Sequence, residues 1–135
     1  MSGALAVASQ PLTFLAFDFG ARRVGVATGN SLTRTATPLT TVAVEGEARM
    51  AAIAALIAEW RPAALVVGVP RHPDGAAHAN TERARRFGRQ LKARFGLPVH
   101  EVDERYTTTD AIRAGAADLD AAAAAIILEQ HLAGL

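Results

Sequence analysis

The segment Ala64–Val69 constrains the fold most, because it reads ALVVGV and is apolar at nearly every position. A strand with this pattern is typical of a sheet that is covered on both faces. On either side of it, Glu47–Trp60 and His78–Phe95 have apolar residues at helical spacing. The pattern predicts an α/β fold in which helices cover a central strand. The core positions expected on the two helices are Met50, Ile53, Ile57 and Trp60, then Ala84, Phe87, Leu91 and Phe95.

Three strand-like segments precede this unit. Leu12–Phe17 is a short apolar run that ends at Asp18, and Val24–Thr28 is a second short strand. Ser31–Val44 is rich in Thr and Val, and Pro38 within it indicates an edge strand or a bulge. Three consecutive strands without an intervening helix predict an antiparallel meander.

The C-terminal part continues the alternation. We expect a strand at Leu97–Val102, a short helix at Thr107–Ala114 and a last helix at Leu119–Leu132. The order β-β-β-α-β-α-β-α is that of the ribonuclease H-like fold, a mixed five-stranded sheet with helices on both faces. We expect residues 1–11 to form a flexible leader and residues 12–135 a single domain.

Composition excludes several classes of protein. The chain has no cysteine, which rules out a disulfide scaffold, a thiolate zinc site and a cysteine nucleophile. Its longest apolar run, Ala121–Leu128, is far shorter than the roughly 20 residues of a membrane-spanning helix. The first ten residues have no basic region typical of a signal peptide. These features predict a cytoplasmic protein without a membrane partner. The sequence leaves open whether the protein is a monomer or a homodimer.

Three of the six aspartates lie at the ends of predicted elements. Asp18 ends the first strand, Asp103 ends the last strand and Asp120 opens the final helix. If the first and last strands approach one another, their carboxylates repel unless a divalent cation lies between them. Carboxylates suit Mg²⁺ or Mn²⁺, and two such ions can promote phosphodiester hydrolysis. Glu104 directly follows Asp103, so strand register decides which of the two points inward.

Each acid also has an ordinary structural explanation. Asp18 could initiate the turn at Gly20, and Asp120 could be an acid favoured at a helix N-terminus. Asp103 could form a surface ion pair with Arg105 or Arg22. Three independent coincidences at element ends are less favoured than a single shared metal site.

Basic residues are concentrated between Thr81 and Gly96, where six of them accompany one acid, whereas the net charge of the whole chain is only +1. A basic helix of this kind can hold a polyanion, or it can simply be a solvated arginine face. The residues expected to contact nucleic acid are Arg22, Arg23, Arg71, Arg85, Arg86, Arg89, Lys92 and Arg105.

Four segments together resemble the YqgF family of RuvX-like Holliday junction resolvases, and the resemblance extends from Leu12 to Leu132. The segments are FDFG with RRVGVA (Phe17–Gly20, Arg22–Ala27), VVGVP with DG (Val66–Pro70, Asp74–Gly75), DERYTT (Asp103–Thr108), and Asp120 with the apolar run to Leu128.

The resemblance implies a ribonuclease H-like nuclease linked to maturation of the 5′ end of precursor 16S ribosomal RNA, although some members are discussed as junction resolvases. It places the acidic site on Asp18, on the Asp103–Glu104 pair and on Asp120. The implied cofactor is Mg²⁺ or Mn²⁺, bound by Asp18, Asp103 and Asp120. The implied partner is nucleic acid, with RNA preferred and branched DNA as the alternative.

One loop departs from the family pattern. The family usually has Leu-Pro-Leu-Asn-Met-Asp-Gly where this chain has the segment Val69–Gly75, with Arg71, His72 and Pro73. This change leaves open a catalytically silent protein that binds nucleic acid. A phosphotransferase of the sugar-kinase and actin type also begins with an Asp-x-Gly turn, but such proteins are usually much longer than 135 residues.

Overall fold

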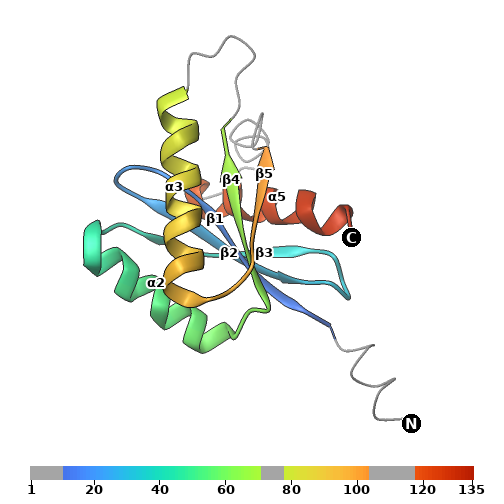
Figure 1. The fold of residues 1–135 in the computed structure, drawn as a ribbon. Coiled ribbons are helices and arrows are strands. Elements are labelled where there is room, and N and C mark those ends of the chain that lie inside the picture. Colours follow the sequence, from blue (N-terminus) through green and yellow to red (C-terminus); the bar gives the residue numbers. More distant parts are fainter. Residues whose placement is uncertain (1–10, 71–77, 104–117) are drawn as a thin grey trace.

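The computed structural model describes residues 11–70, 78–103 and 118–135. Within these ranges, five strands and three helices follow one another in the predicted order (Figure 1). The elements are β1 (Thr13–Asp18), β2 (Val24–Asn30), β3 (Ala36–Val42), α2 (Gly46–Trp60), β4 (Ala64–Val69), α3 (His78–Phe95), β5 (Val99–Asp103) and α5 (Leu119–Ala133). Most of the expected leader and the whole of the expected helix Thr107–Ala114 lie outside the described residues.

The strands form one mixed sheet in the order β3-β2-β1-β4-β5. The first three strands are antiparallel, which confirms the predicted meander, and β4 and β5 run parallel to β1. The predicted juxtaposition of Asp18 and Asp103 required the first and last strands to approach one another, and these strands are not neighbours in the sheet. The crossovers through α2 and α3 place β4 beside β1 and β5 beyond it, so β4 separates the two.

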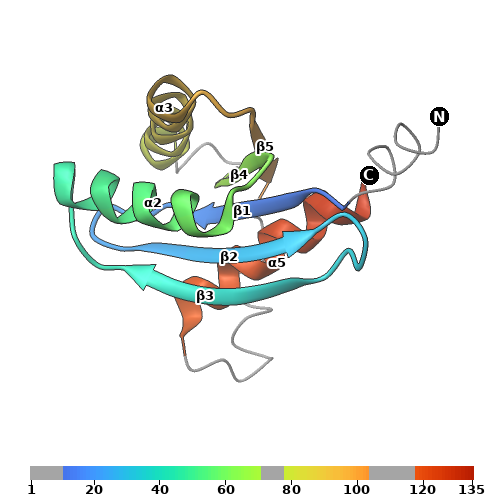
Figure 2. The ribbon, with the colours of Figure 1, turned by 90° about the horizontal axis from the view of Figure 1, so that it is seen from below.

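The helices form two layers, with α2 and α3 on one face of the sheet and α5 on the other (Figure 2). Alternation along β1 supplies both cores: Leu15 and Phe17 pack in the cluster that includes α2 and α3, and Phe14 and Ala16 pack under α5. Each fully buried leucine or phenylalanine side chain contributes about 1.5–3 kcal/mol to stability. The continuous apolar pattern of β4 is explained because both of its faces are covered.

Two of the strand boundaries that differ from the prediction have local explanations. The third strand begins at Ala36 rather than Ser31, because the Asn30 side chain accepts hydrogen bonds from the backbone N–H groups of Leu32 and Thr33 and closes a turn. The last strand begins at Val99, directly after Pro98, which has no N–H to donate. Pro38 lies in an edge strand where the pairing with β2 shifts register, so both interpretations of this residue hold.

Glycines in β2 allow α5 to lie very close to the sheet. A Cβ atom on Gly25 would be 1.8 Å from the carbonyl oxygen of Asp120, and one on Gly29 would be 3.0 Å from Cδ2 of Leu128 in α5. The helix matches this close packing with five consecutive buried alanines, Ala121–Ala125. The alanine run therefore has a structural role, in that small side chains let this helix approach β2. In the described part of the chain, no helix is both long enough and apolar enough to cross a membrane.

Candidate active site

Asp18 and Asp120 line the same cavity, which has a volume of about 620 Å³. Asp18 is the last residue of β1, and alternation after Phe14 and Ala16 turns its side chain toward α5. Asp120 lies in the first turn of α5. The structure thus brings together two of the three aspartates that the sequence singled out. The other residues lining the cavity are Arg23, Thr41, Ala43, Asp118, Leu119 and Ala123.

Gly25 is the reason that these two acids share a cavity. It pairs with Asp18 across the sheet, and the backbone of Asp120 lies directly above it. Any larger residue at this position would push the start of α5 away from the end of β1. Sequence reasoning included Gly25 only in the family pattern, although a glycine beside a strand-ending acid is a sign of close backbone approach.

Asp118, which the sequence reasoning did not single out, is the N-cap of α5. Its carboxylate accepts a hydrogen bond from the Ala121 backbone N–H at 3.0 Å, and the Thr41 hydroxyl donates to both of its oxygens at 2.7 and 2.9 Å. The Ala121 N–H is the main cause that lowers the pKa of Asp118; the Thr41 hydroxyl and the Arg23 charge act in the same direction, and burial opposes them. The pairing ties α5 to the edge strand β3. Aspartate is a preferred N-cap residue, so an aspartate three residues before Ala121, near the start of the predicted helix, is the sequence signal that could have identified Asp118 as the N-cap.

Arg23 pairs with Asp120 inside this cavity. Its Nε lies 3.4 Å from Oδ2 of Asp120, and the two side chains are 65% and 31% exposed. An exposed pair of this kind contributes only about 0–1 kcal/mol, so a metal ion or a phosphate can displace it at little cost. Arg23 was expected to contact nucleic acid, and it is the basic residue that the structure places among the acids.

Asp103 lies on a different face from Asp18. In β5, His100 stacks on His131 of α5, whereas Glu101 lies 3.5 Å from Arg85 of α3. Alternation therefore puts Asp103 on the α3 side of the sheet with Glu101. Its register partner is Val69, and Asp18 pairs with Gly68, one residue earlier in β4. Glu104 falls outside the described residues.

Most of the expected nucleic-acid contacts lie away from the acids. Helix α3 covers the opposite face of the sheet (Figure 2), and two of the arginines expected to bind there pair with carboxylates, Arg85 with Glu101 and Arg89 with Glu82. Lys92 and Arg22 are exposed, and Arg86 lines a second cavity between α2 and α3. Arg71 and Arg105 fall outside the described residues.

The donor set of the acidic cavity fits a hard divalent cation. Asp18 and Asp120 offer carboxylate oxygens, the ligands preferred by Mg²⁺ and Mn²⁺. Across residues 11–70, 78–103 and 118–135, no three or more His, Cys, Asp or Glu side chains are grouped closely enough to hold a metal. Two acids alone would leave most positions around the ion to water, to substrate or to a further acid.

The chain resembles known proteins over nearly its whole length. The model of the family described as "RuvX: Holliday junction resolvase" matches residues 12–134. A protein of Polaromonas sp. strain JS666, named "Putative pre-16S rRNA nuclease", is 68% identical over 91% of this chain and 89% of its own length. A relative with the same name from Burkholderia pseudomallei strain 668 is 55% identical over 100% of this chain and 95% of its own.

Among solved structures, RuvC of T. thermophilus in complex with a Holliday junction substrate superposes with a TM-score of 0.57. It is 15% identical, and the match covers 91% of this chain and 94% of RuvC. At this identity the likeness shows the fold alone, and it confirms the predicted ribonuclease H-like architecture. The fold, the family match and two close relatives agree, and the chain belongs to the RuvX family.

Proposed function

We propose that this chain is a metal-dependent nuclease that hydrolyses phosphodiester bonds in RNA, at the 5′ end of precursor 16S ribosomal RNA, in the cytoplasm. The observation that carries the proposal is the cavity shared by Asp18 and Asp120 in a member of the RuvX family. The name of the relatives from Polaromonas and Burkholderia supports the choice of substrate. The family description supports a four-way DNA junction as the second candidate substrate.

In this mechanism the protein contributes ligands and position. Asp18 and Asp120 would hold Mg²⁺ or Mn²⁺, which when bound lowers the pKa of a water molecule and stabilises the oxygen that leaves phosphorus. Arg23 would exchange its contact with Asp120 for a substrate phosphate next to the acids. The N-cap contacts of Asp118 tie the first turn of α5, and with it Asp120, to Thr41 in the edge strand β3 of the same sheet.

For the third acid, alternation in β5 argues against Asp103, which leaves the neighbouring Glu104 of the predicted pair. The even-numbered His100 contacts α5 and the odd-numbered Glu101 contacts α3, so Asp103 lies on the α3 side with Glu101 and not on the side of Asp18. We therefore propose Glu104 as the third ligand and Asp103 as a residue at the α3 side of the site. Glu104→Gln should reduce cleavage far more than Asp103→Asn; equal losses would contradict the assignment.

The decisive experiment is cleavage of labelled RNA that carries the 5′ precursor segment, with Mg²⁺ or Mn²⁺ and with EDTA as the metal-free condition. Wild type is compared with Asp18→Asn and with Glu59→Gln, which removes one exposed carboxylate of α2 far from the cavity. We expect Glu59→Gln to cut like wild type and Asp18→Asn to cut at least about 100-fold more slowly. A four-way DNA junction in the same assay separates the two nuclease functions. Equal cutting by Asp18→Asn would refute the site, and binding without cleavage by wild type would favour a catalytically silent protein.

A further inference from the structure

A second cavity, of about 260 Å³, opens between α2 and α3 on the other side of the β1–β2 connection. Phe19, the residue after Asp18, lies in its wall, so the two cavities flank the same short connection. Three arginines line the second cavity, and no carboxylate lines it within the described residues. Its polar and backbone walls are Arg49, Arg83, Arg86, Gln90 and Gly46.

Arg49 is the most constrained of these arginines, with only 7% of its surface exposed. Its Nε donates to the carbonyl oxygen of Val44 at 2.9 Å and its Nη2 to that of Ala21 at 3.0 Å, while the guanidinium lies 5.7 Å from the centre of the Phe19 ring. These contacts fix the side chain but leave its charge unneutralised, since no ion pair to Arg49 occurs among the described residues. Burial lowers the pKa of Arg49, and the nearby charge of Glu45 only partly opposes this.

The arginines of α3 divide into two groups. Arg85, Arg89 and Arg94 pair with Glu101, Glu82 and Glu47 respectively. Arg83 and Arg86, which line the cavity, form no ion pair in the part of the chain that the structure describes. The unpaired positive charge of this helix therefore includes the two arginines that face Arg49.

The start of α2 adds to the positive potential. Gly46, the first residue of α2, lines the cavity, and the N-cap residue Glu45 makes no side-chain hydrogen bond to the helix. The first N–H groups of a helix lack partners within the helix and carry a partial positive charge. A buried arginine, two surface arginines and a helix N-terminus thus converge on one small space.

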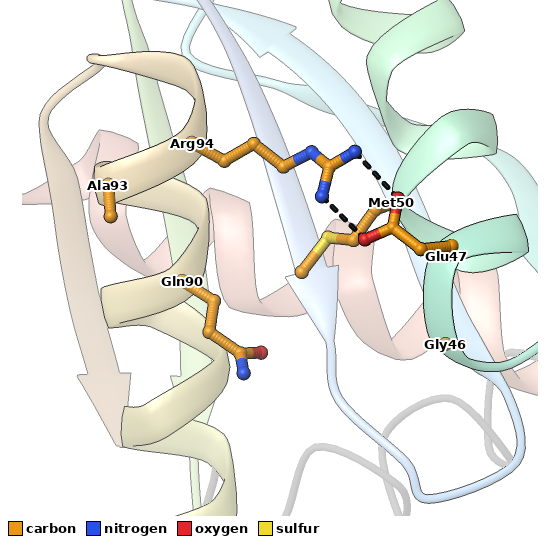
Figure 3. A pocket seen from close by; sticks show the side chains of 6 residues that line it. All are labelled: Gly46, Glu47, Met50, Gln90, Ala93 and Arg94. Atoms are coloured by element: carbon orange, nitrogen blue, oxygen red, sulfur yellow. Dashed lines mark hydrogen bonds and ion pairs between the residues drawn. The ribbon is translucent and has the colours of Figure 1, made fainter.

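A neighbouring cavity between the same two helices lacks this excess of positive charge. This larger cavity of about 620 Å³ shares Gly46, Met50 and Gln90 with the second cavity and continues between α2 and α3. There Arg94 donates two hydrogen bonds of 2.8 Å to Glu47, which neutralises the pair (Figure 3). An anion is therefore favoured at the Arg49 end of the groove and not at the Arg94 end.

We propose that the cavity lined by Arg49, Arg83 and Arg86 binds a phosphate group of the nucleic-acid strand whose cleaved bond lies in the acidic cavity. This inference rests on the proposed function only in taking the phosphate to be part of the substrate strand. That the cavity favours an anion follows from its arginines alone. Its volume is below the roughly 300–1,000 Å³ of pockets for whole small molecules, which favours a single anionic group. The fork of an arginine matches the oxygens of a phosphate. A strand that crosses the β1–β2 connection would place one phosphate on each side of it.

The test uses the full chain in EDTA, so that nothing is cleaved. The double variant Arg83→Ala/Arg86→Ala removes two exposed side chains of α3 and should leave the fold intact. Arg61→Asn, at the far end of α2, removes one exposed charge at a left-handed backbone position that asparagine tolerates, and serves as the control. Arg86→Lys keeps the charge without the fork. The probes are inorganic phosphate, followed by calorimetry, and a fluorescent single-stranded RNA, followed by anisotropy over a range of salt concentrations.

We expect the double variant to lose phosphate binding and to bind the RNA about tenfold more weakly. The slope of log affinity against log salt should decrease by about 0.7, which corresponds to one lost phosphate contact on a single strand. Arg86→Lys should bind more weakly than wild type but more tightly than the double variant, and Arg61→Asn should bind as wild type does.

Three other outcomes would count against the proposal. Phosphate binding lost with RNA affinity unchanged would assign the cavity to free phosphate or a nucleotide and overturn its place on the substrate strand. Unchanged binding of both probes would overturn the site itself, and an equal loss in Arg61→Asn would reduce it to general surface charge. Because no metal or cleavage is involved, a chain without nuclease activity would still give a clear answer here.

Discussion

The two cavities beside the β1–β2 connection are built in opposite ways. The acidic cavity depends on backbone placement, since the carbonyl of Asp120 rests on Gly25 and the N-cap of α5 is tied to Thr41. The basic cavity depends on long side chains that reach from a helix surface, with Arg49 alone held rigidly. Adding one methyl group at the packing contact should therefore disrupt the acidic cavity. The basic cavity should lose binding only when a charged side chain is removed.

The largest expected effect is that of Gly25→Ala. The added Cβ would lie 1.8 Å from the Asp120 carbonyl oxygen, which is backbone and cannot rotate away. The start of α5 must then move, at a cost of about 3 kcal/mol or more, and the two acids separate. We expect a matching loss in the free energy of unfolding, measured in urea, together with loss of nuclease activity.

Gly88→Ala is the matched control on the other face. A Cβ on Gly88 would meet the nearest atom, Val99 Cγ1, at 3.4 Å, which is ordinary contact. Because alanine favours the interior of a helix, this variant should be stabilised by about 0.5–1 kcal/mol. If Gly25→Ala were as stable as wild type, or if both variants lost stability equally, the contrast between the two faces would be wrong.

The second prediction separates the cavities by kinetics. Asp18→Asn should lower kcat at least about 100-fold with little change in KM. The substitution weakens a metal ligand but removes no contact with the substrate strand in the second cavity. Arg83→Ala/Arg86→Ala should raise KM about tenfold with kcat nearly unchanged, because it removes binding that ground state and transition state share. Steady-state rates on labelled RNA measure both. A fall in kcat for the arginine variant would place that cavity in the chemical step.

The third prediction concerns the N-cap on the acidic side. Asp118→Asn should lose about 1 kcal/mol of stability at neutral pH, because the charged acceptor for the Ala121 N–H and the Thr41 hydroxyl is weakened. The pKa of Asp118 is lower in the folded chain, so the folded state favours the ionised form. Its contribution is complete above the unfolded pKa of about 3.9 and is lost as the pH falls through the folded value. Urea unfolding from pH 7 to pH 3 should show wild type and variant converging; a constant gap would contradict this.

The sequence predicted element types better than it predicted the site. Periodicity identified both core-facing helices, and the continuous apolar pattern identified β4, because these patterns reflect burial directly. Asp18 and Asp120 were singled out because burying a carboxylate at the end of an apolar element is costly unless a positive charge pairs with it, and the structure places both in one cavity. The relation of Asp103 to Asp18 could not be predicted, since it depends on strand order and on register to within one residue. Arg49 gave no signal either, because its carbonyl acceptors come from two separate loops.

The smallest expected effect is on the pH dependence of stability, and it arises at the C-terminal end of α5. His131 packs edge-on against Phe14 and stacks on His100, and burial, followed by the charge of His100, lowers its pKa. The unfolded chain therefore binds a proton more readily, so this stability is complete above about pH 6.5 and is lost as the pH falls through the folded pKa. The ring is only partly buried, and solvent screening limits the effect to roughly a few tenths of a kcal/mol. His131→Gln should remove this slope in urea unfolding between pH 7 and pH 5.5, and His100→Gln should remove only the smaller part, because burial remains. A larger effect from His100→Gln would show that charge repulsion, rather than burial, governs this end of the helix.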